Sequence, residues 1–181
     1  MLQWLNRNRR AFRNDRRGTA AVEFALAATL LIVGLLNAVD FGYYMYQRME
    51  VEYAAEVGAQ AAWKACYDTS SMLPATQNCP GVNNTITAAI QSTSLGTNVS
   101  LNGGAPTEGY YCATSAGALQ SVGSLASKPA NCSVAGNAAV SPGDYIQVAV
   151  SYPYAPLFPG VTVMSLWGLS SISMTSWMRL G

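Results

Sequence analysis

The sequence predicts an α+β protein in which one long N-terminal helix is followed by a small antiparallel β-sheet. The helix is indicated by an uninterrupted apolar run at residues 19–39 and by helical periodicity that continues to about residue 64. The sheet is indicated near the C-terminus, where apolar and polar residues alternate at 145–152 and again at 170–179. One helix followed by strands is an order typical of the α+β class.

These patterns divide the 181 residues into three segments. A helix that long far exceeds the usual mean of about 11–12 residues and is typical of membrane-spanning or coiled elements. We expect a basic leader at 1–18, a long helix at 19–65 whose part at 19–41 crosses a membrane, and an α+β domain outside that membrane at 66–181.

Charge is scarce and unevenly distributed. Charged residues make up 10% of the chain, against about 25% in average proteins, which favours an envelope or secreted protein over a cytosolic enzyme. Residues 1–18 carry six Arg and one Asp, whereas residues 19–181 carry four basic and eight acidic residues. The Arg cluster is compatible with a nucleic-acid-binding arm, but the apolar run behind it favours membrane topology with the leader on the cytoplasmic side. We therefore expect no nucleic-acid partner.

The apolar run from Thr19 to Val39 has Glu23 as its only charged residue. As a helix it reaches roughly 30 Å, which is the thickness of the hydrocarbon core of a bilayer. A secretory signal peptide is the alternative, but its apolar region is shorter, about 7–15 residues, and a small-residue cleavage site follows it. The longer run and the lack of such a site favour a helix that stays in the membrane.

Beyond the apolar run the helix becomes amphipathic. Tyr43, Tyr44 and Tyr46 stand where an aromatic belt would meet the membrane surface. Small residues at helical spacing allow close approach either of another helix or of the chain's own domain. The charged positions that recur on one side are Arg48, Glu52 and Glu56, and the small positions on another side are Ala54, Gly58, Ala62 and Ala65.

All four cysteines follow the apolar run, and none belongs to a CxxC motif. An even number outside the cytoplasm favours two disulfides. Cys66 and Cys79 are close enough in sequence to close the loop between them, which would add about 3 kcal/mol. Cys112 and Cys132 would staple the Ser-, Ala- and Gly-rich segment 114–143. Four cysteines allow three pairings, so this connectivity is one hypothesis of three.

The remaining segments predict short elements. Residues 82–95 favour a helix with Asn83 or Asn84 as its N-cap. The apolar residues 161–167 favour a helical turn or a strand, and the pattern does not decide between them. Strands are expected at 98–102, 110–113, 145–152 and 170–179, and the last two are expected to pair.

No catalytic constellation is visible in the sequence. The chain contains no His, which removes the commonest general base and the commonest metal ligand. Nucleophile-elbow, dinucleotide-binding and P-loop motifs are absent, and the carboxylates are scattered. Lys64 and Lys128 lie in ordinary contexts, so a Ser–Lys pair has no supporting motif. We therefore expect no catalytic residue, no metal site, no cofactor and no enzymatic activity.

Glu23 is the most chemically informative residue of the apolar run. An unpaired carboxylate there costs about 2.5–3.5 kcal/mol on insertion scales, so that charges inside membranes are usually paired and functional. If the chain is cut between Gly18 and Thr19, the new α-amino group lies four residues from Glu23 on the same helix face. The two groups can then neutralise each other within one subunit or between neighbours. Alternatively, Glu23 extends toward the Arg cluster at the membrane surface.

The start of the helix resembles a known processing signal. A basic leader, then Gly18, then Glu23 and an apolar helix are similar to the class III signal of type IV pilin-like proteins. The resemblance to the TadE-like family of pseudopilins covers residues 16–65 well and 145–180 moderately, and does not cover the middle of the chain. The motifs that carry it are Arg17–Leu26, Asp40–Gly42, Glu56–Gln60, Val148–Tyr154 and Trp177–Arg179.

The resemblance implies a minor pilin or pseudopilin of the tight-adherence (Flp-type) type IV pilus system, with a pilin-like fold. It implies cleavage between Gly18 and Thr19 by a prepilin peptidase, and roles for Glu23 and Phe24 in assembly and in register with neighbouring subunits. The implied partners are inner-membrane lipid, the peptidase, other pilin or pseudopilin subunits and the pilus assembly platform. The implied roles of the pilus are surface adhesion and biofilm formation.

The resemblance also implies a cellular location, and it implies a minor rather than a major pilus component. The location is the bacterial inner membrane, crossed once with the N-terminus cytoplasmic and the C-terminal domain periplasmic, or an extracellular pilus after assembly. Phe24 stands where the major Flp pilins usually have Tyr, and the chain beyond the helix is far larger than theirs, so a minor component is implied. The alternative function is a membrane-tethered periplasmic binding module or enzyme whose helix is only a signal anchor.

Overall fold

A computed structural model describes residues 17–66 and 70–181 of the chain. Helix α2 (Arg17–Cys66) is 50 residues long, and an antiparallel sheet follows it. The predicted α+β class with a long N-terminal helix is therefore confirmed. The chain forms two compact units, which do not follow the order of the sequence. Unit 1 combines the described part of Met1–Gly42 with Pro156–Gly168, and unit 2 combines Tyr43–Ala155 with Leu169–Gly181.

Strand β4 (Gly143–Pro153) is the longest strand of the five-stranded sheet in unit 2. Strand β5 (Ser171–Arg179) pairs with β4 over nine residue pairs, so the predicted pairing of the last two strands is confirmed. Strands β1 (Ser100–Leu101) and β2 (Thr107–Ala113) also pair with β4, and β3 (Leu119–Ser121) pairs with β2. All these pairings are antiparallel.

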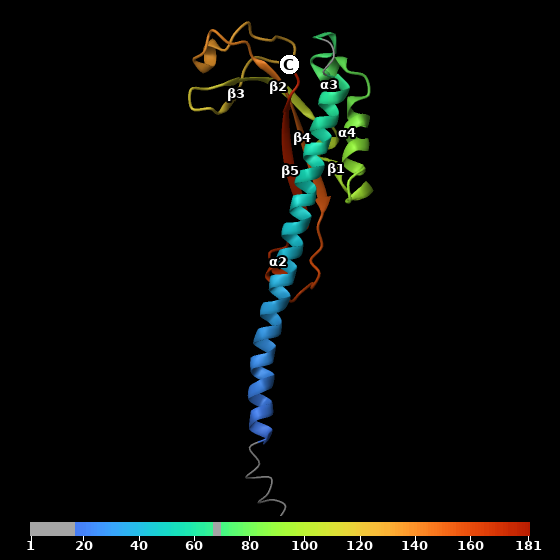
Figure 1. Ribbon diagram of the computed structural model, residues 1–181, viewed down its shortest axis with the longest axis vertical. Coiled ribbons are helices and arrows are strands. Elements are labelled where there is room, and N and C mark those ends of the chain that lie inside the picture. Colours follow the sequence, from blue (N-terminus) through green and yellow to red (C-terminus); the bar gives the residue numbers. More distant parts are fainter. Residues whose placement is uncertain (1–16, 67–69) are drawn as a thin grey trace, which may run out of the picture. The chain divides into compact units, whose positions relative to one another are not determined.

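The core of unit 2 lies between the C-terminal half of α2, helix α4 (Val82–Gln91) and the sheet (Figure 1). Gly58 shows how closely these elements approach: a Cβ atom there would lie 2.8 Å from Cγ2 of Ile90 and 3.1 Å from Cγ1 of Val148. The small residues of α2 therefore pack against the chain's own domain. The sequence had allowed either this domain or another helix as the packing partner. Buried residues of these elements are Val51, Ala54, Ala55, Ala59, Ala62, Ile86, Ile90, Ile146, Val148, Val150 and Ile172.

Several local predictions need correction. Ala65 is exposed and does not belong to the packed face of α2. Neither Asn83 nor Asn84 caps α4, because the residue before the helix is Gly81, whose left-handed backbone (φ 76°) turns the chain into it without a side-chain bond. Tyr43 and Tyr44 are half-buried, with their ring centroids 6.1 and 5.3 Å from the ring centroid of Tyr154, and Tyr46 is exposed. The aromatic belt at the membrane surface stays a prediction.

Two disulfides close segments of unit 2, and they are the two pairs expected from the sequence. Cys66 is bonded to Cys79, and Cys112 of β2 is bonded to Cys132. The segment 114–143, expected as a loop, contains β3 and a short 3-10 helix. Residues 161–167 form a helical turn rather than a strand. The remaining short helices are η1 (Ser70–Met72), α3 (Ala75–Asn78), η2 (Gly96–Asn98), η3 (Asn102–Gly104), η4 (Ser133–Ala135) and α5 (Val163–Leu166).

Candidate functional site at the start of the long helix

The Gly18–Thr19 peptide bond lies in the first turn of α2, which begins at Arg17. Both residues are exposed, and a Cβ atom on Gly18 would have no neighbour within 4 Å.

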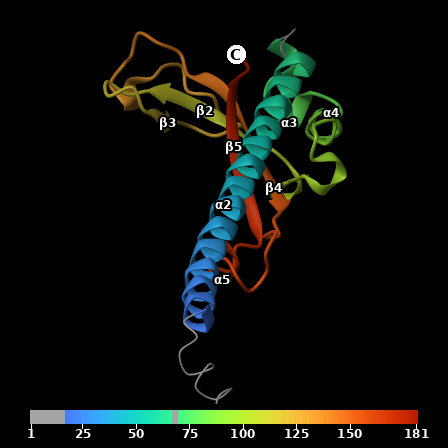
Figure 2. The ribbon, with the colours of Figure 1, turned by 60° about the horizontal axis from the view of Figure 1, so that its bottom comes forward.

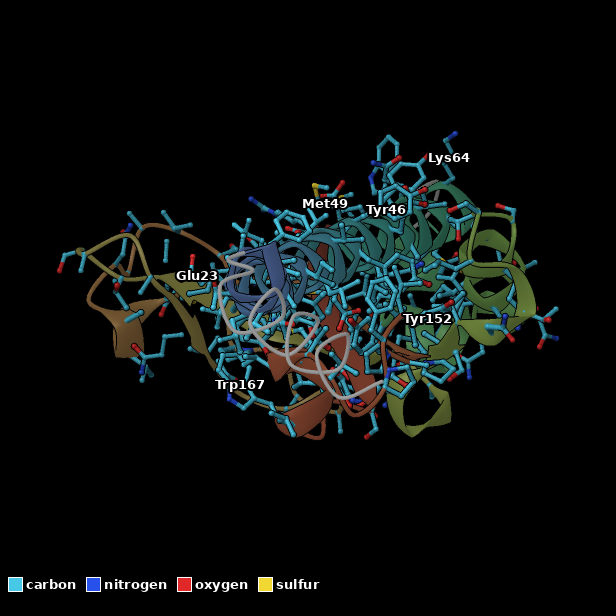
Figure 3. The ribbon with its side chains drawn as sticks, turned by 90° about the horizontal axis from the view of Figure 1, so that it is seen from below. Glu23, Tyr46, Met49, Lys64, Tyr152 and Trp167 are labelled. Carbon is cyan, nitrogen blue, oxygen red and sulfur yellow. A yellow bond between two sulfur atoms is a disulfide. The ribbon has the colours of Figure 1, made fainter. Side chains whose placement is uncertain are left out.

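Glu23 lies about one turn further along α2 and points away from the helix (Figure 3). Its carboxylate is exposed, and within the described part of the chain it forms no ion pair or hydrogen bond. In a membrane such a carboxylate needs a positive partner. An α-amino group at Thr19, created by cleavage, would lie four residues away on the same helix face. The geometry thus leaves Glu23 available for the pairing that the sequence suggests.

The helix surface around Glu23 is apolar on every side. Phe24 is 75% exposed and Leu30 is 78% exposed. A helix that is apolar all round is stable only when lipid or other protein surrounds it. Among the described residues one helix, Gly18–Cys66, is long and apolar enough to cross a membrane. The other exposed large apolar residues up to Phe41 are Val22, Leu26, Leu31, Ile32, Val33, Leu35, Val39 and Phe41.

Two polar residues at the end of the apolar run, Asn37 and Asp40, have a structural role that the sequence did not reveal. Asp40 is fully buried; its Oδ1 accepts a hydrogen bond of 2.8 Å from the Leu157 amide, and its Oδ2 accepts one from the Thr162 hydroxyl. Asn37 accepts a bond of 2.8 Å from the Val163 amide. These bonds hold the segment around α5 against the N-terminal half of α2 in unit 1 (Figure 2).

Unit 2 holds a separate pair of carboxylates. Asp144 of β4 is buried, and neither of its carboxylate oxygens has a hydrogen-bonding partner among the described residues. Burial, and then the charge of Glu108 on the adjacent strand β2, raise the pKa of Asp144 to about 7, while the charge of Lys128 lowers it. Glu108 also accepts bonds of 2.6 and 2.7 Å from the amides of Ala75 and Thr76 at the start of α3.

Burial, and then the neighbouring charge of Glu108, both favour the protonated form of Asp144. Lys128 lies over the ring of Tyr110, with Nζ 5.2 Å from the ring centroid. Burial of Tyr110, followed by the charges of Asp144 and Glu108, raises the pKa of the Tyr110 hydroxyl. In the sequence, only the spacing of Gly18 and Glu23 indicated a functional site. Asp40 and Asp144 could not be singled out, because the residues around them come together only in the folded chain.

Comparison with known proteins identifies the segment that contains the first of these sites. Residues 18–60 match the family model described as TadE-like protein. Comparisons with curated proteins and with solved structures gave no match. The resemblance to the TadE-like family is thus confirmed over a segment that begins at Gly18 and includes Glu23, Asp40 and Gly58. The match supports a protein associated with the tight-adherence pilus. Among the described residues, the length and apolar composition of α2 fit a single-pass membrane anchor. The resemblance at 145–180 lies outside the match and stays a prediction.

Proposed function

We propose that this protein is a minor pilin or pseudopilin that is needed to assemble a tight-adherence (Flp-type) type IV pilus. The observation that carries the proposal is the exposed carboxylate of Glu23, which has no partner in the described chain and lies five positions after Gly18 on an apolar helix. A helix that serves only as a tether needs neither residue at that spacing. The TadE-like match over the same helix supports the proposal.

The first step of this function is proteolytic processing. A prepilin peptidase cleaves the chain between Gly18 and Thr19 and removes the Arg-rich leader on the cytoplasmic side of the inner membrane. The positive charge of the leader supports this orientation. The two disulfides support a periplasmic location for unit 2, because disulfides persist in oxidising compartments.

The second step is association with other pilin or pseudopilin subunits and with the assembly platform. The apolar surface from Phe24 to Val39 contacts lipid first and then packs against neighbouring helices. Glu23 pairs with the α-amino group of Thr19 in its own chain or in a neighbour and so sets the register between subunits. Beyond the apolar run, the exposed side chains of Tyr46 and Met49 lie on one side of α2 (Figure 3) and extend the contact surface. The assembled pilus supports surface adhesion and biofilm formation.

Replacing Glu23 by Ala tests this proposal. We expect Glu23→Ala to be cleaved almost as wild type, because the carboxylate lies beyond the scissile bond, and to be impaired in pilus assembly, because the register contact is lost. Processing is measured by the mass of the protein extracted from membranes, and assembly by the amount of pilus sheared from cells.

Glu52→Ala is the matched control, since Glu52 is an exposed carboxylate on the same helix beyond the apolar run. It should leave both readouts unchanged. Normal piliation of cells that produce Glu23→Ala would contradict the proposed role of Glu23 and would favour a simple membrane tether.

A further inference from the structure

The segment Pro156–Gly168, called the strap below, exposes five large apolar side chains within 13 residues. It contains no charged residue. Leu166 is 73% exposed and Trp167 is 68% exposed, and Figure 3 shows Trp167 on the outer side of the strap. Clustered exposure of large apolar side chains marks a surface that contacts protein or membrane. The other exposed apolar residues of the strap are Leu157, Val161 and Val163.

Polar bonds fix the opposite side of the strap to α2. Thr162 and Met164 are buried, and the Thr162 hydroxyl donates to the carboxylate of Asp40. The amides of Leu157 and Val163 donate to Asp40 and Asn37, as described above. The strap therefore has a polar inner side that binds the helix and an apolar outer side.

The attachment points of the strap lie at a defined distance along the apolar helix. Asn37 and Asp40 follow Gly18 by 19 and 22 residues, which corresponds to about 28 and 33 Å along an α-helix. The hydrocarbon core of a bilayer is about 30 Å thick. When α2 crosses a membrane with Gly18 at one boundary of this core, the strap is attached at the other boundary.

We infer that the strap is a second membrane contact, in which Leu166 and Trp167 enter the lipid surface of the leaflet where α2 leaves the bilayer. The inference rests on the membrane-spanning helix of the proposed function. Trp is enriched at membrane interfaces because its ring is apolar and its N–H is polar. An ionised carboxylate at the core boundary is costly without donors, and the strap supplies two donors to Asp40. Lipid rather than a protein groove is favoured because the strap carries no charge that would specify a protein partner.

Fluorescence of single-tryptophan variants of the full chain tests this inference. The chain has four Trp residues; replacing Trp4, Trp63 and Trp177 by Phe leaves Trp167 as the sole fluorophore. A matched variant keeps only Trp63, which is 40% exposed and lies 23 positions beyond Asp40 on α2. Both are reconstituted into phosphatidylethanolamine–phosphatidylglycerol vesicles, with brominated acyl chains as the lipid quencher and iodide as the aqueous quencher.

We expect Trp167 to emit at shorter wavelength than Trp63, to be quenched by lipids brominated near the headgroup, and to lose most of its quenching by iodide. Trp63 should show the reverse pattern. Equal iodide quenching of both residues, with no quenching by brominated lipid, would overturn the inference. Protection of Trp167 from both quenchers would also overturn it and would instead indicate a protein contact.

Alkaline extraction of the vesicles separates failure of the inference from failure of the proposed function. A chain that resists extraction while its Trp167 stays accessible to iodide contradicts the strap contact alone. A chain that alkali removes contradicts the membrane-spanning helix and the strap contact together. Thr162→Val in the Trp167-only background removes one donor to Asp40 at nearly constant volume and should increase iodide quenching of Trp167. An unchanged value would show that the bond to Asp40 does not hold the strap in place.

Discussion

Asp40 and Asp144 are both fully buried carboxylates, but their surroundings differ. Asp40 accepts hydrogen bonds from Leu157 and Thr162, which replace the water that it loses. Asp144 has no such donor among the described residues and has the carboxylate of Glu108 beside it. A buried carboxylate without donors is disfavoured in its ionised form. Asp144 should therefore make the stability of the protein depend on pH.

The direction of that dependence follows from the pKa of Asp144, which is about 7 in the folded chain against an ordinary value of 3.8. Between these values the folded chain keeps a proton that the unfolded chain has lost. The free energy of unfolding therefore falls as pH rises from about 4 to about 7, by up to about 1.4 kcal/mol per pH unit, and the dependence fades above that pH as folded Asp144 also loses its proton.

Asp144→Asn removes this titration, and its amide can donate to Glu108. We expect the midpoint of thermal unfolding of this variant to fall less than that of wild type between pH 5 and pH 8. The measurement is circular dichroism of the full chain in detergent micelles. Glu52→Gln, which changes an exposed carboxylate, should keep the wild-type profile. Equal pH dependence of Asp144→Asn and wild type would exclude Asp144 as the responsible group.

The residues to which we assign a role differ in how far the sequence reveals them. Gly18 and Glu23 can be recognised in the sequence because the signal is their spacing of five positions within one predicted helix. Asp40 and Thr162 are not, because 122 positions separate them and only the fold brings them together. Glu108 and Asp144 meet across two strands for the same reason. Local patterns cannot encode such contacts.

At the scale of elements, α2 changes its surroundings along its length. Up to about Phe41 most of its large apolar side chains are exposed, whereas from Val51 onward small residues on one side pack against α4 and β4. Gly58 lies in the closest part of this contact, where Ile90 and Val148 leave no room for a Cβ atom. The helix thus contains both a part that is long and apolar enough to cross a membrane and a part that belongs to the core of unit 2.

Two glycine substitutions in α2 measure the closeness of this packing. Gly58→Ala and Gly42→Ala both gain about 1 kcal/mol from helix propensity. Only Gly58→Ala also meets stiff buried side chains, and overpacking of this kind costs about 1–3 kcal/mol. We therefore expect Gly58→Ala to be less stable than Gly42→Ala, which has no neighbour within 4 Å of the new atom. Unfolding of the full chain in micelles checks this, and equal stabilities would show that the contact is loose.

The elements with strong periodicity could be predicted, and those set by backbone geometry could not. In β4 and β5 more buried and more exposed residues alternate along the strand, because one side of each strand lies over the core. The beginning of α4 depends on the left-handed conformation of Gly81 rather than on an Asn cap. The helical turn α5 depends on the bonds that Asn37 and Asp40 make to the strap. The sequence of residues 161–167 alone did not decide between a helical turn and a strand.

At the scale of the whole molecule, the two compact units contribute different properties. Unit 1 contains the proposed processing site, Glu23, the apolar helix surface and the strap, which are the features that the proposal connects with membrane and assembly. Unit 2 contains both disulfides, the sheet and the paired carboxylates. The TadE-like match covers residues 18–60 of α2 and does not extend to the sheet.

The N-terminus of the mature protein tests the central proposal most directly, because the pairing of Glu23 requires a new α-amino group at Thr19. The protein is purified from the membranes of cells that contain a prepilin peptidase and from cells that lack it, and the intact mass of each is measured. We predict a chain that begins at Thr19 in the first case and an uncleaved chain in the second. An intact Met1 in both, or an N-terminus near Tyr43, would contradict the proposal.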